Sequence, residues 1–289
     1  LRTAARHRHG GCGPRFHLSR PHSTPLPMGF FRDWRRRRAL AALHIDEAHW
    51  QQAEACLPFL GHLTAADRQR LRQLVREFLV DKEWSGARGL ALSAPMQLSI
   101  ALQACLLVLN LGLDHYRGWI GIVVYPGDFV IPRQLMDEDG VVHEFDDQVL
   151  GEAWEGGPVL VSWFDRPEDA DGVNVVIHEF AHKLDMENGA VDGLPRLPDG
   201  MSTKAWRAAF EPAYDNFCAR VDSGEETRLD PYAAEHPSEF FAVMSEAFFE
   251  TPALLLGEYP AVYTQLRRYY RQDPAGAGEQ PSQAPQAYC

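Results

Sequence analysis

The spacing of apolar residues predicts that the chain is built mainly from helices. Over residues 64–84 apolar positions recur every three or four residues, so Leu71 and Phe78 would share the inward face of an amphipathic helix. Thr64 followed three residues later by Asp67 is typical of a capping box, in which each side chain bonds the other's backbone. This helix is therefore expected to begin just after Thr64.

Other segments predict further helices and two short strands. Residues 95–113 are apolar apart from isolated polar positions, which indicates a buried core helix rather than a membrane span. Helices are also predicted over 205–221 and 236–252, and strands over 119–125 and 158–163. This order of elements indicates an α+β fold that is mostly helical, with a small mixed sheet beside the helix described next.

The motif HEFAH at residues 178–182 carries the candidate chemistry. Positions four apart lie on the same face of a helix, so His178 and His182 can bind one metal ion. Glu179 is rotated by about 100°, which keeps its carboxylate off the ion but within reach of a water that the ion activates. These residue types are the minimum for zinc-assisted hydrolysis, although five positions can also match by chance on a charged helix.

A third ligand is needed, because catalytic zinc usually has three protein ligands and one open position. The long motif with a downstream Gly and a third His is excluded, since Asp185 and Asn188 stand at those positions. The apolar helix 236–252 offers Glu239 and Glu246 on one face, and buried carboxylates need partners. We expect Glu239 to be the ligand; the alternatives are a first-turn acid that complements the helix dipole and, for Glu246, an arginine pair.

Three stretches carry a resemblance to a known family: IHEFAHKLD at 177–185, DPYAA at 230–234 and PSEFFAVMSE at 237–246. They resemble the zinc metallopeptidases of the Mlc titration factor A type, and the similarity extends over about residues 28–274. The resemblance implies a zincin-like fold related to the catalytic domain of anthrax lethal factor, with one Zn²⁺ per chain. It also implies a gluzincin-like hydrolase that acts on peptides or proteins.

Carried over to this sequence, the resemblance implies that His178, His182 and Glu239 bind the zinc ion and that Glu179 is the general base. Tyr232 falls where the family places a tyrosine that points at the site. Its phenol would donate a hydrogen bond to the oxyanion of the tetrahedral intermediate. An ordinary half-buried tyrosine is the alternative.

Two acidic residues are candidates to support the ligands. A metal-binding imidazole usually donates its second N–H to a carboxylate or carbonyl, and Asp185 or Glu246 could accept it. For Asp185 the alternative is a capping or salt-bridging role near the helix end at Asn188 and Gly189.

Substrate binding requires more than a metal. In proteins of this type a sheet edge beside the active-site helix pairs with the peptide as an added strand. Val159, Leu160 and Val161 in the strand 158–163 are expected to supply that edge, and an interior strand without a free edge is the alternative. Whether cleavage is internal or at chain ends, as in an aminopeptidase, stays open.

Composition fits one enzyme domain. With 289 residues, of which 45% are hydrophobic and 24% charged, the chain can bury a substantial core without disulfides. The five cysteines are scattered and include no CxxC pair, which favours a reducing compartment. We therefore expect a cytoplasmic protein without a transmembrane segment.

Charge is divided unevenly along the chain. The first 38 residues carry ten Lys or Arg against one acid, a balance of +9, and subtracting this from the net charge of −12 leaves −21 for residues 39–289. The strong negative charge of residues 39–289 argues against nucleic acid as a direct partner. Phe30, Phe31 and Trp34 among the arginines could dock on anionic lipid or nucleic acid. We expect instead a solvated lead-in whose aromatic rings pack on the domain.

The same asymmetry suggests how the chain is divided. Residues 1–27 lack acids and a potential core, so we expect a disordered, non-native extension upstream of a functional start at Met28, with an organelle transit peptide as the alternative. Residues 28–45 would form a basic lead-in and 46–271 a single zincin-like metallopeptidase domain. Residues 272–289 would form a disordered tail.

Together these features predict a zinc metallopeptidase that hydrolyses peptide bonds with Glu179 as general base. The resemblance also implies an alternative, a regulatory binding module that sequesters a transcriptional repressor protein, with peptidase activity secondary. A structural zinc protein is disfavoured, because no fourth protein ligand is found in the sequence.

Overall fold

Helices make up most of the fold. The computed structural model describes residues 28–127, 129–136, 142–149, 151–153, 156–163 and 173–277. Its α-helices are α1 (Met28–Ala42), α2 (Glu47–Ala55), α3 (Ala65–Asp81), α4 (Ala94–Leu107), α5 (Val175–Asp185), α6 (Thr203–Asp222), α7 (Pro237–Glu250), α8 (Pro252–Glu258) and α9 (Pro260–Tyr270). Its strands are β1 (Glu83–Gly86), β2 (Gly121–Pro126), β3 (Phe129–Met136), β4 (Val142–Val149), β5 (Gly151–Ala153) and β6 (Val159–Trp163). Among the described helices, none combines the length and apolarity needed to cross a membrane.

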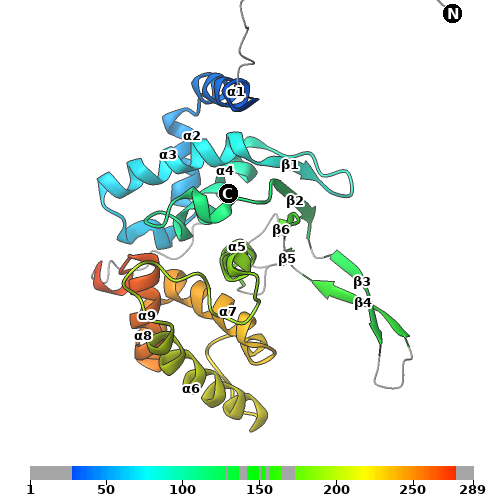
Figure 1. Ribbon diagram of the computed structural model, residues 1–289, viewed down its shortest axis with the longest axis vertical. Coiled ribbons are helices and arrows are strands. Elements are labelled where there is room, and N and C mark those ends of the chain that lie inside the picture. The colour runs from blue at the N-terminus through cyan, green and yellow to red at the C-terminus, as the bar shows by residue number, and fades with distance from the viewer. Residues whose placement is uncertain are drawn as a thin grey trace, which may run out of the picture.

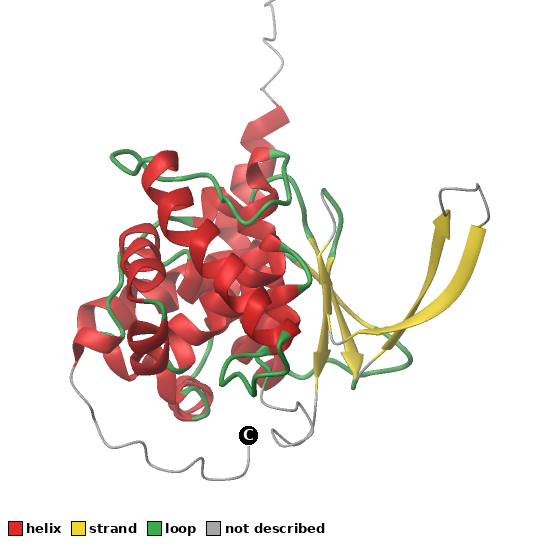
Figure 2. Cartoon of the chain, turned by 90° about the horizontal axis from the view of Figure 1, so that it is seen from below, coloured by secondary structure: helices red, strands yellow, loops and turns green. Residues whose placement is uncertain are grey.

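The helices gather on one side of the molecule and the strands on the other (Figure 2). The main sheet has the strand order β1-β2-β6-β5, in which β1, β2 and β6 run parallel and β5 runs antiparallel to β6. Strands β3 and β4 form a separate antiparallel hairpin that projects away from the body (Figure 1). The fold is thus α+β with a small mixed sheet.

Helix α5 lies at the centre of the fold. All of its residues are buried, and it contacts α4, α7, β5 and β6. The Asn174 side chain accepts a hydrogen bond from the N–H of Ile177 at 3.0 Å and so caps the start of the helix. Figure 1 shows α5 nearly end-on between the part that contains α3 and α4 and the part that contains α6 to α9. Because packing surrounds α5, its side chains have little freedom of position.

Helix α7 is anchored by an aromatic face. Phe240, Phe241, Phe248 and Phe249 are at most 1% exposed. Burying one such ring contributes on the order of 2–3 kcal/mol. Their partners are rings from α6 and from the start and end of α9: Trp206, Phe210, Phe217, Tyr259, Tyr263, Tyr269 and Tyr270. The position of α7 is therefore strongly specified.

Helix α3 begins where the sequence predicts and ends earlier. The hydroxyl of Thr64 accepts a hydrogen bond from the N–H of Asp67 at 3.1 Å, and the capping box is complete. The helix ends at Asp81 rather than near Trp84, because Glu83–Gly86 leave it to pair with β2. A partner strand almost forty residues away overrides the local helical pattern there.

The folded part extends beyond the expected start of the tail. Gln272 is buried, and its amide donates a hydrogen bond to the carbonyl of Leu106 at 2.8 Å. A short 3-10 helix follows at Ala275–Ala277. The order of the chain therefore continues at least to this helix. The predicted extension 1–27 and, within the predicted tail 272–289, residues 278–289 lie outside the described residues.

Gly193 joins three helices at one backbone position. Its φ of +75° lies in the left-handed region that favours glycine. Its N–H donates to Oδ2 of Asp185 at 2.9 Å, and its carbonyl accepts from Nε1 of Trp206 at 3.0 Å. A Cβ at this position would lie 2.4 Å from the carbonyl oxygen of Pro237. The end of α5, the first turn of α6 and the start of α7 thus meet at Gly193.

We predict that Gly193→Ala destabilises the fold by about 3 kcal/mol or more, because it adds a clash with Pro237 to the strain of a left-handed backbone. Gly200→Ala is the matched control, since Gly200 has a φ of +87° but nothing lies within 4 Å of an added Cβ. Strain alone should cost this control about 1–2 kcal/mol. Urea unfolding measures both losses. Equal losses would contradict the clash.

Candidate metal centre

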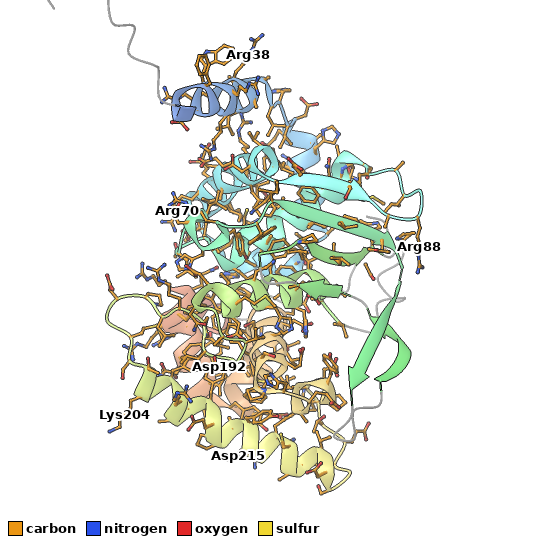
Figure 3. The ribbon with its side chains drawn as sticks, turned by 45° about the vertical axis from the view of Figure 1, so that its right-hand side comes forward. Arg38, Arg70, Arg88, Asp192, Lys204 and Asp215 are labelled. Carbon is orange, nitrogen blue, oxygen red and sulfur yellow. The ribbon has the colours of Figure 1, made fainter. Side chains whose placement is uncertain are left out.

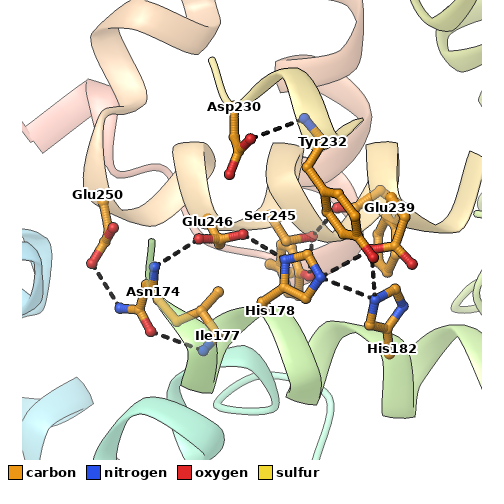
Figure 4. A network of polar contacts seen from close by, with 12 residues as sticks. Asn174, Ile177, His178, His182, Asp230, Tyr232, Glu239, Ser245, Glu246 and Glu250 are labelled. Carbon is orange, nitrogen blue, oxygen red and sulfur yellow. Dashed lines mark hydrogen bonds and ion pairs between the residues drawn. The ribbon is translucent and has the colours of Figure 1, made fainter. Parts of the chain in front are cut away.

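Two helices meet at a cluster of three ligand-type side chains. His178 and His182 lie one turn apart on α5, and Glu239 comes from the first turn of α7. Oε2 of Glu239 lies 3.0 Å from Nε2 of His178 and 3.1 Å from Nε2 of His182. The two Nε2 atoms are 3.1 Å apart. Figure 4 shows the three side chains pointing toward one another. The fold thus brings the two histidines of the motif to the downstream carboxylate.

The chemistry and spacing of these atoms fit a bound metal ion. Each of the three residues offers one ligand atom, and these atoms lie within 4.8 Å of one another. Ligand atoms about 2.0–2.1 Å from a tetrahedral zinc ion would be about 3.3 Å apart, close to the separations observed. His178 and His182 are buried and Glu239 is partly exposed. The cluster is largely enclosed but not sealed from solvent.

The cluster holds charge in a buried place. Burial lowers the pKa of His178, but hydrogen bonds with Glu239 and Glu246 outweigh it, so the pKa stands well above its ordinary value. Burial likewise raises the pKa of Glu239, but hydrogen bonds from His178 and His182 outweigh that effect, and the pKa stands far below its usual range. In the metal-free protein a proton on His178 therefore balances part of the negative charge.

Glu246 connects α7 to the first histidine. Its Oε1 accepts a hydrogen bond from Nδ1 of His178 at 2.7 Å, and its Oε2 accepts one from the backbone N–H of Asn174 at 2.8 Å. A carboxylate on Nδ1 leaves Nε2 to face the cluster. Among the described residues its ion-pair partner is this histidine, whereas an arginine was the alternative in the sequence.

Asp185 holds a loop rather than an imidazole. It is fully buried, and burial raises its pKa to about 6. Its Oδ2 accepts the hydrogen bond from Gly193. Its Oδ1 and Nδ1 of His182 are both buried, and neither has a hydrogen-bond partner among the described residues. The structure therefore places Asp185 nearer to the capping role than to direct support of a ligand.

Glu179 lies beside the cluster, against the edge of the main sheet. It is 5% exposed. Gly151 of β5 packs directly on it, since a Cβ at that position would lie 2.4 Å from Oε1 of Glu179. Any other residue at position 151 would displace this carboxylate.

Tyr232 stands at the rim of the cluster. It belongs to a short 3-10 helix, Pro231–Ala234, and its N–H donates to Oδ1 of Asp230 at 2.9 Å. Its side chain is 52% exposed, and its ring centre lies 6.2 Å from that of His178. Figure 4 shows the ring extending toward the ligand side chains. A half-exposed tyrosine therefore lies next to the candidate ligands.

The strand expected to bind substrate is an interior strand. Val159, Leu160 and Val161 are buried and pair with β2 on one side and with β5 on the other. The expectation of a free edge on β6 is therefore corrected, because the short strand Gly151–Ala153 already covers it. Among the described strands, the outer edge beside α5 belongs to β5.

Sequence reasoning missed three residues that shape the site, namely Asn174, Gly151 and Gly193. An Asn directly before an apolar helical run is an N-cap signal, so Asn174 could have been found. The two glycines carry no local signal. Each is required by a segment far away in the sequence, Gly151 by Glu179 and Gly193 by Pro237.

Comparisons with known proteins identify the family. The profile of the glucose-regulated metallo-peptidases M90 matches residues 31–271. Mlc titration factor A of Klebsiella pneumoniae (strain 342) is 37% identical over 233 residues, 79% of this chain and 87% of that protein. Two further Mlc titration factor A proteins are 39% identical over 78% of this chain. The match covers 88% of the protein from Serratia proteamaculans (strain 568) and 85% of the protein from Yersinia pestis (strain Pestoides F). The family resemblance in the sequence is confirmed, and the chain belongs to the glucose-regulated metallo-peptidase M90 family.

Proposed function

We propose that this protein is a zinc-dependent peptidase with a zincin-like fold. The observation that carries the proposal is the convergence of His178, His182 and Glu239 within hydrogen-bond distance of one another. Membership of a metallo-peptidase family supports a metal at this place. Two imidazole nitrogens and one carboxylate oxygen are a donor set typical of catalytic zinc, which keeps a fourth position for water or substrate.

Glu179 is the proposed general base. When bound, zinc supplies a Lewis acid that polarises the scissile carbonyl and makes a water molecule more acidic. Glu179 accepts the proton of the attacking water and returns it to the leaving amine. Its burial against Gly151 restricts the carboxylate to few orientations, as efficient proton transfer requires.

Tyr232 is the proposed donor to the developing oxyanion. Its ring lies beside that of His178, and its phenol can donate a hydrogen bond to the carbonyl oxygen as negative charge grows there. Loss of one such donor typically lowers the rate about a hundredfold or more. This role agrees with the position of the family's tyrosine in the sequence.

The peptide substrate is proposed to add as a strand at the outer edge of β5. This strand ends the main sheet among the described strands, and its Gly151 touches Glu179. A peptide paired with β5 would present a carbonyl close to the general base. The proposed substrate edge therefore moves from Val159–Val161 on β6 to Gly151–Ala153 on β5.

A second candidate function is binding of a repressor protein. The relatives at 37–39% identity are named Mlc titration factor A, which favours a partner of that kind for this chain as well. A panel of chromogenic peptides with and without a chelator, together with a repressor pull-down, separates the two functions. Turnover that the chelator abolishes and zinc restores supports the peptidase. Absent or chelator-insensitive turnover with repressor capture supports the binding function alone.

We predict that Glu179→Gln lowers turnover at least about a hundredfold while the protein keeps its metal, because the amide has the same shape but cannot accept the proton. Metal analysis and peptide hydrolysis measure the two properties separately. Glu211→Gln on the exposed face of α6 is the control and should change neither. Undiminished turnover by zinc-loaded Glu179→Gln would refute the general-base assignment.

We predict that Glu246→Gln weakens zinc binding by about 10–100-fold, because an amide cannot accept both N–H groups that Glu246 now holds. Glu250→Gln, one turn further along α7, is the matched control. Glu250 accepts a hydrogen bond from the side chain of Asn174 at 2.7 Å but touches no candidate ligand. Competition with a chromophoric chelator measures both affinities, and equal values would remove the positioning role of Glu246.

We predict that zinc binding releases at least one proton and strengthens as the pH rises. The pKa of His178 is raised well above 6.5, so its proton stabilises the metal-free site at neutral pH and is lost only as the pH rises through the raised pKa. Zinc requires the neutral imidazole and therefore competes with this proton. Calorimetry in two buffers of different ionisation enthalpy counts the released protons. A binding enthalpy that is independent of the buffer would contradict the prediction.

A further inference from the structure

Helix α1 is fixed to the body by one face. The guanidinium of Arg36 donates to Asp81 at 2.7 and 2.8 Å and to Glu77 at 2.9 Å, both on α3. Arg76 of α3 donates in turn to the carbonyl of Leu40 at 3.0 Å. Positions four apart share a helix face, so Arg36 and Leu40 together set how α1 is rotated on α3.

The opposite face of α1 carries aromatic rings and arginines. Trp34 and Arg38 are each two positions from Arg36 and so project roughly 160° round the helix from it. Trp34 is 51% exposed and Phe31 is 57% exposed. The guanidinium of Arg38 lies 5.5 Å from the centre of the Trp34 ring, and Figure 3 shows Arg38 at the outer end of the molecule. The outer face of α1 is defined here as Phe31, Trp34, Arg35 and Arg38.

For Phe31 and Trp34 this arrangement corrects the expectation that the aromatic rings of the lead-in pack on the domain; the side chain of Phe30 lies outside the described part of the chain. The ion pairs of Arg36 turn that side of the helix toward α3, so Phe31 and Trp34 are left on the side that faces solvent. Two large apolar rings about one turn apart at the surface are unfavourable in water. Together they make a small apolar surface of a kind that a partner can cover.

We propose that the outer face of α1 docks the protein on an anionic lipid surface. Rings of Trp and Phe enter the boundary between head groups and acyl chains, while arginine side chains reach the phosphate groups beside them. Arg35, Arg37 and Arg38 are exposed and available for this contact. Each basic residue near an anionic surface strengthens binding about fivefold. The helix lies along the surface and does not cross the bilayer.

The distribution of charge favours a lipid surface over nucleic acid. Residues 28–42 contain five arginines and one acid, a balance of +4, whereas residues 39–289 carry −21. Helix α1 stands at one end of the molecule (Figure 1), so a flat surface can meet it while the acidic body stays at a distance. Charges more than about 10 Å away are largely screened at physiological salt. A nucleic-acid strand would run on past the helix toward the acidic body, and it offers no apolar layer for Phe31.

The test is co-sedimentation of the full chain with two kinds of vesicle, phosphatidylcholine alone and phosphatidylcholine with about one third phosphatidylserine. Two variants change exposed residues of α1. Trp34→Ser keeps every charge, and a triple variant replaces Arg35, Arg37 and Arg38 by Gln. Both variants keep Arg36, so α1 stays fixed to α3.

The matched control removes the same charge from other exposed arginines. It is the triple variant Arg117→Gln, Arg207→Gln and Arg267→Gln, whose side chains are 77%, 51% and 51% exposed. Arg117 and Arg267 each pair with one surface acid, and Arg207 pairs with two, Asp192 and Glu211. Such exposed pairs contribute little to stability. The control should therefore fold normally and bind vesicles within about threefold of the wild type.

We expect the wild-type chain to bind anionic but not neutral vesicles. The triple variant of Arg35, Arg37 and Arg38 should lose about a hundredfold in affinity and Trp34→Ser about tenfold. Absence of binding to anionic vesicles, equal losses in the two triple variants, or binding unaffected by Trp34→Ser would each overturn the proposal. Tighter binding to an oligonucleotide than to vesicles would also overturn it and would identify nucleic acid as the partner.

Fluorescence locates the contact independently. Vesicles with brominated acyl chains should quench the emission of the wild-type chain, because Trp34 reaches the bromine atoms. The variant Trp34→Phe keeps an aromatic ring and the other six tryptophans of the seven in the chain. It should bind the same vesicles with much less quenching. Quenching equal to that of the wild type would place the lipid contact away from α1 and would overturn the proposal.

Discussion

The structure depends on the meeting of α5 and α7 around the carboxylate of Glu239. A largely buried charge is tolerated only when it is paired, and here its partners are His178 and His182 on one turn of α5. Contacts of 3.0 and 3.1 Å would be lost if either helix moved by about one ångström. The aromatic packing of α7 on α6 and α9 therefore does more than stabilise the core. It also fixes the distance at which the three side chains meet.

Contacts before and after the ligands keep the two helices in register. At one end Asn174 caps α5 and its backbone N–H binds Glu246 of α7. At the other end Asp185 binds the N–H of Gly193, which lies against Pro237 at the start of α7. Two links on opposite sides of the cluster define both the separation and the rotation of the helices. Such support from outside the ligand set is what holds a metal site in its productive geometry.

The spacing of residues within one helix predicts only those features that are local to that helix. His178 and His182 share a face wherever α5 lies, and the capping box fixes the start of α3. Glu239 required two further arguments, the need of a buried carboxylate for a partner and the family resemblance. The incorrect expectations concern pairing between distant segments. Gly151–Ala153 is too short to show an alternating pattern, and it joins β6 through backbone hydrogen bonds that any sequence can make. Strand β1 is likewise formed by pairing with a distant strand, β2, and this pairing ends α3 earlier than the sequence predicts.

The charge of the site favours a divalent cation over a proton. Three carboxyl groups, on Glu179, Glu239 and Glu246, lie near the two imidazoles. With the carboxyl groups ionised and the imidazoles neutral, the sum is −3; one proton on His178 brings it to −2, and one divalent cation brings it to −1. Uncompensated charge becomes more unfavourable as the surroundings become less polar, so the buried cluster favours the cation. In the proposed peptidase, Glu239 would bind the ion and Glu246 would orient its ligand. The remaining negative charge would then lie on Glu179, the proposed general base.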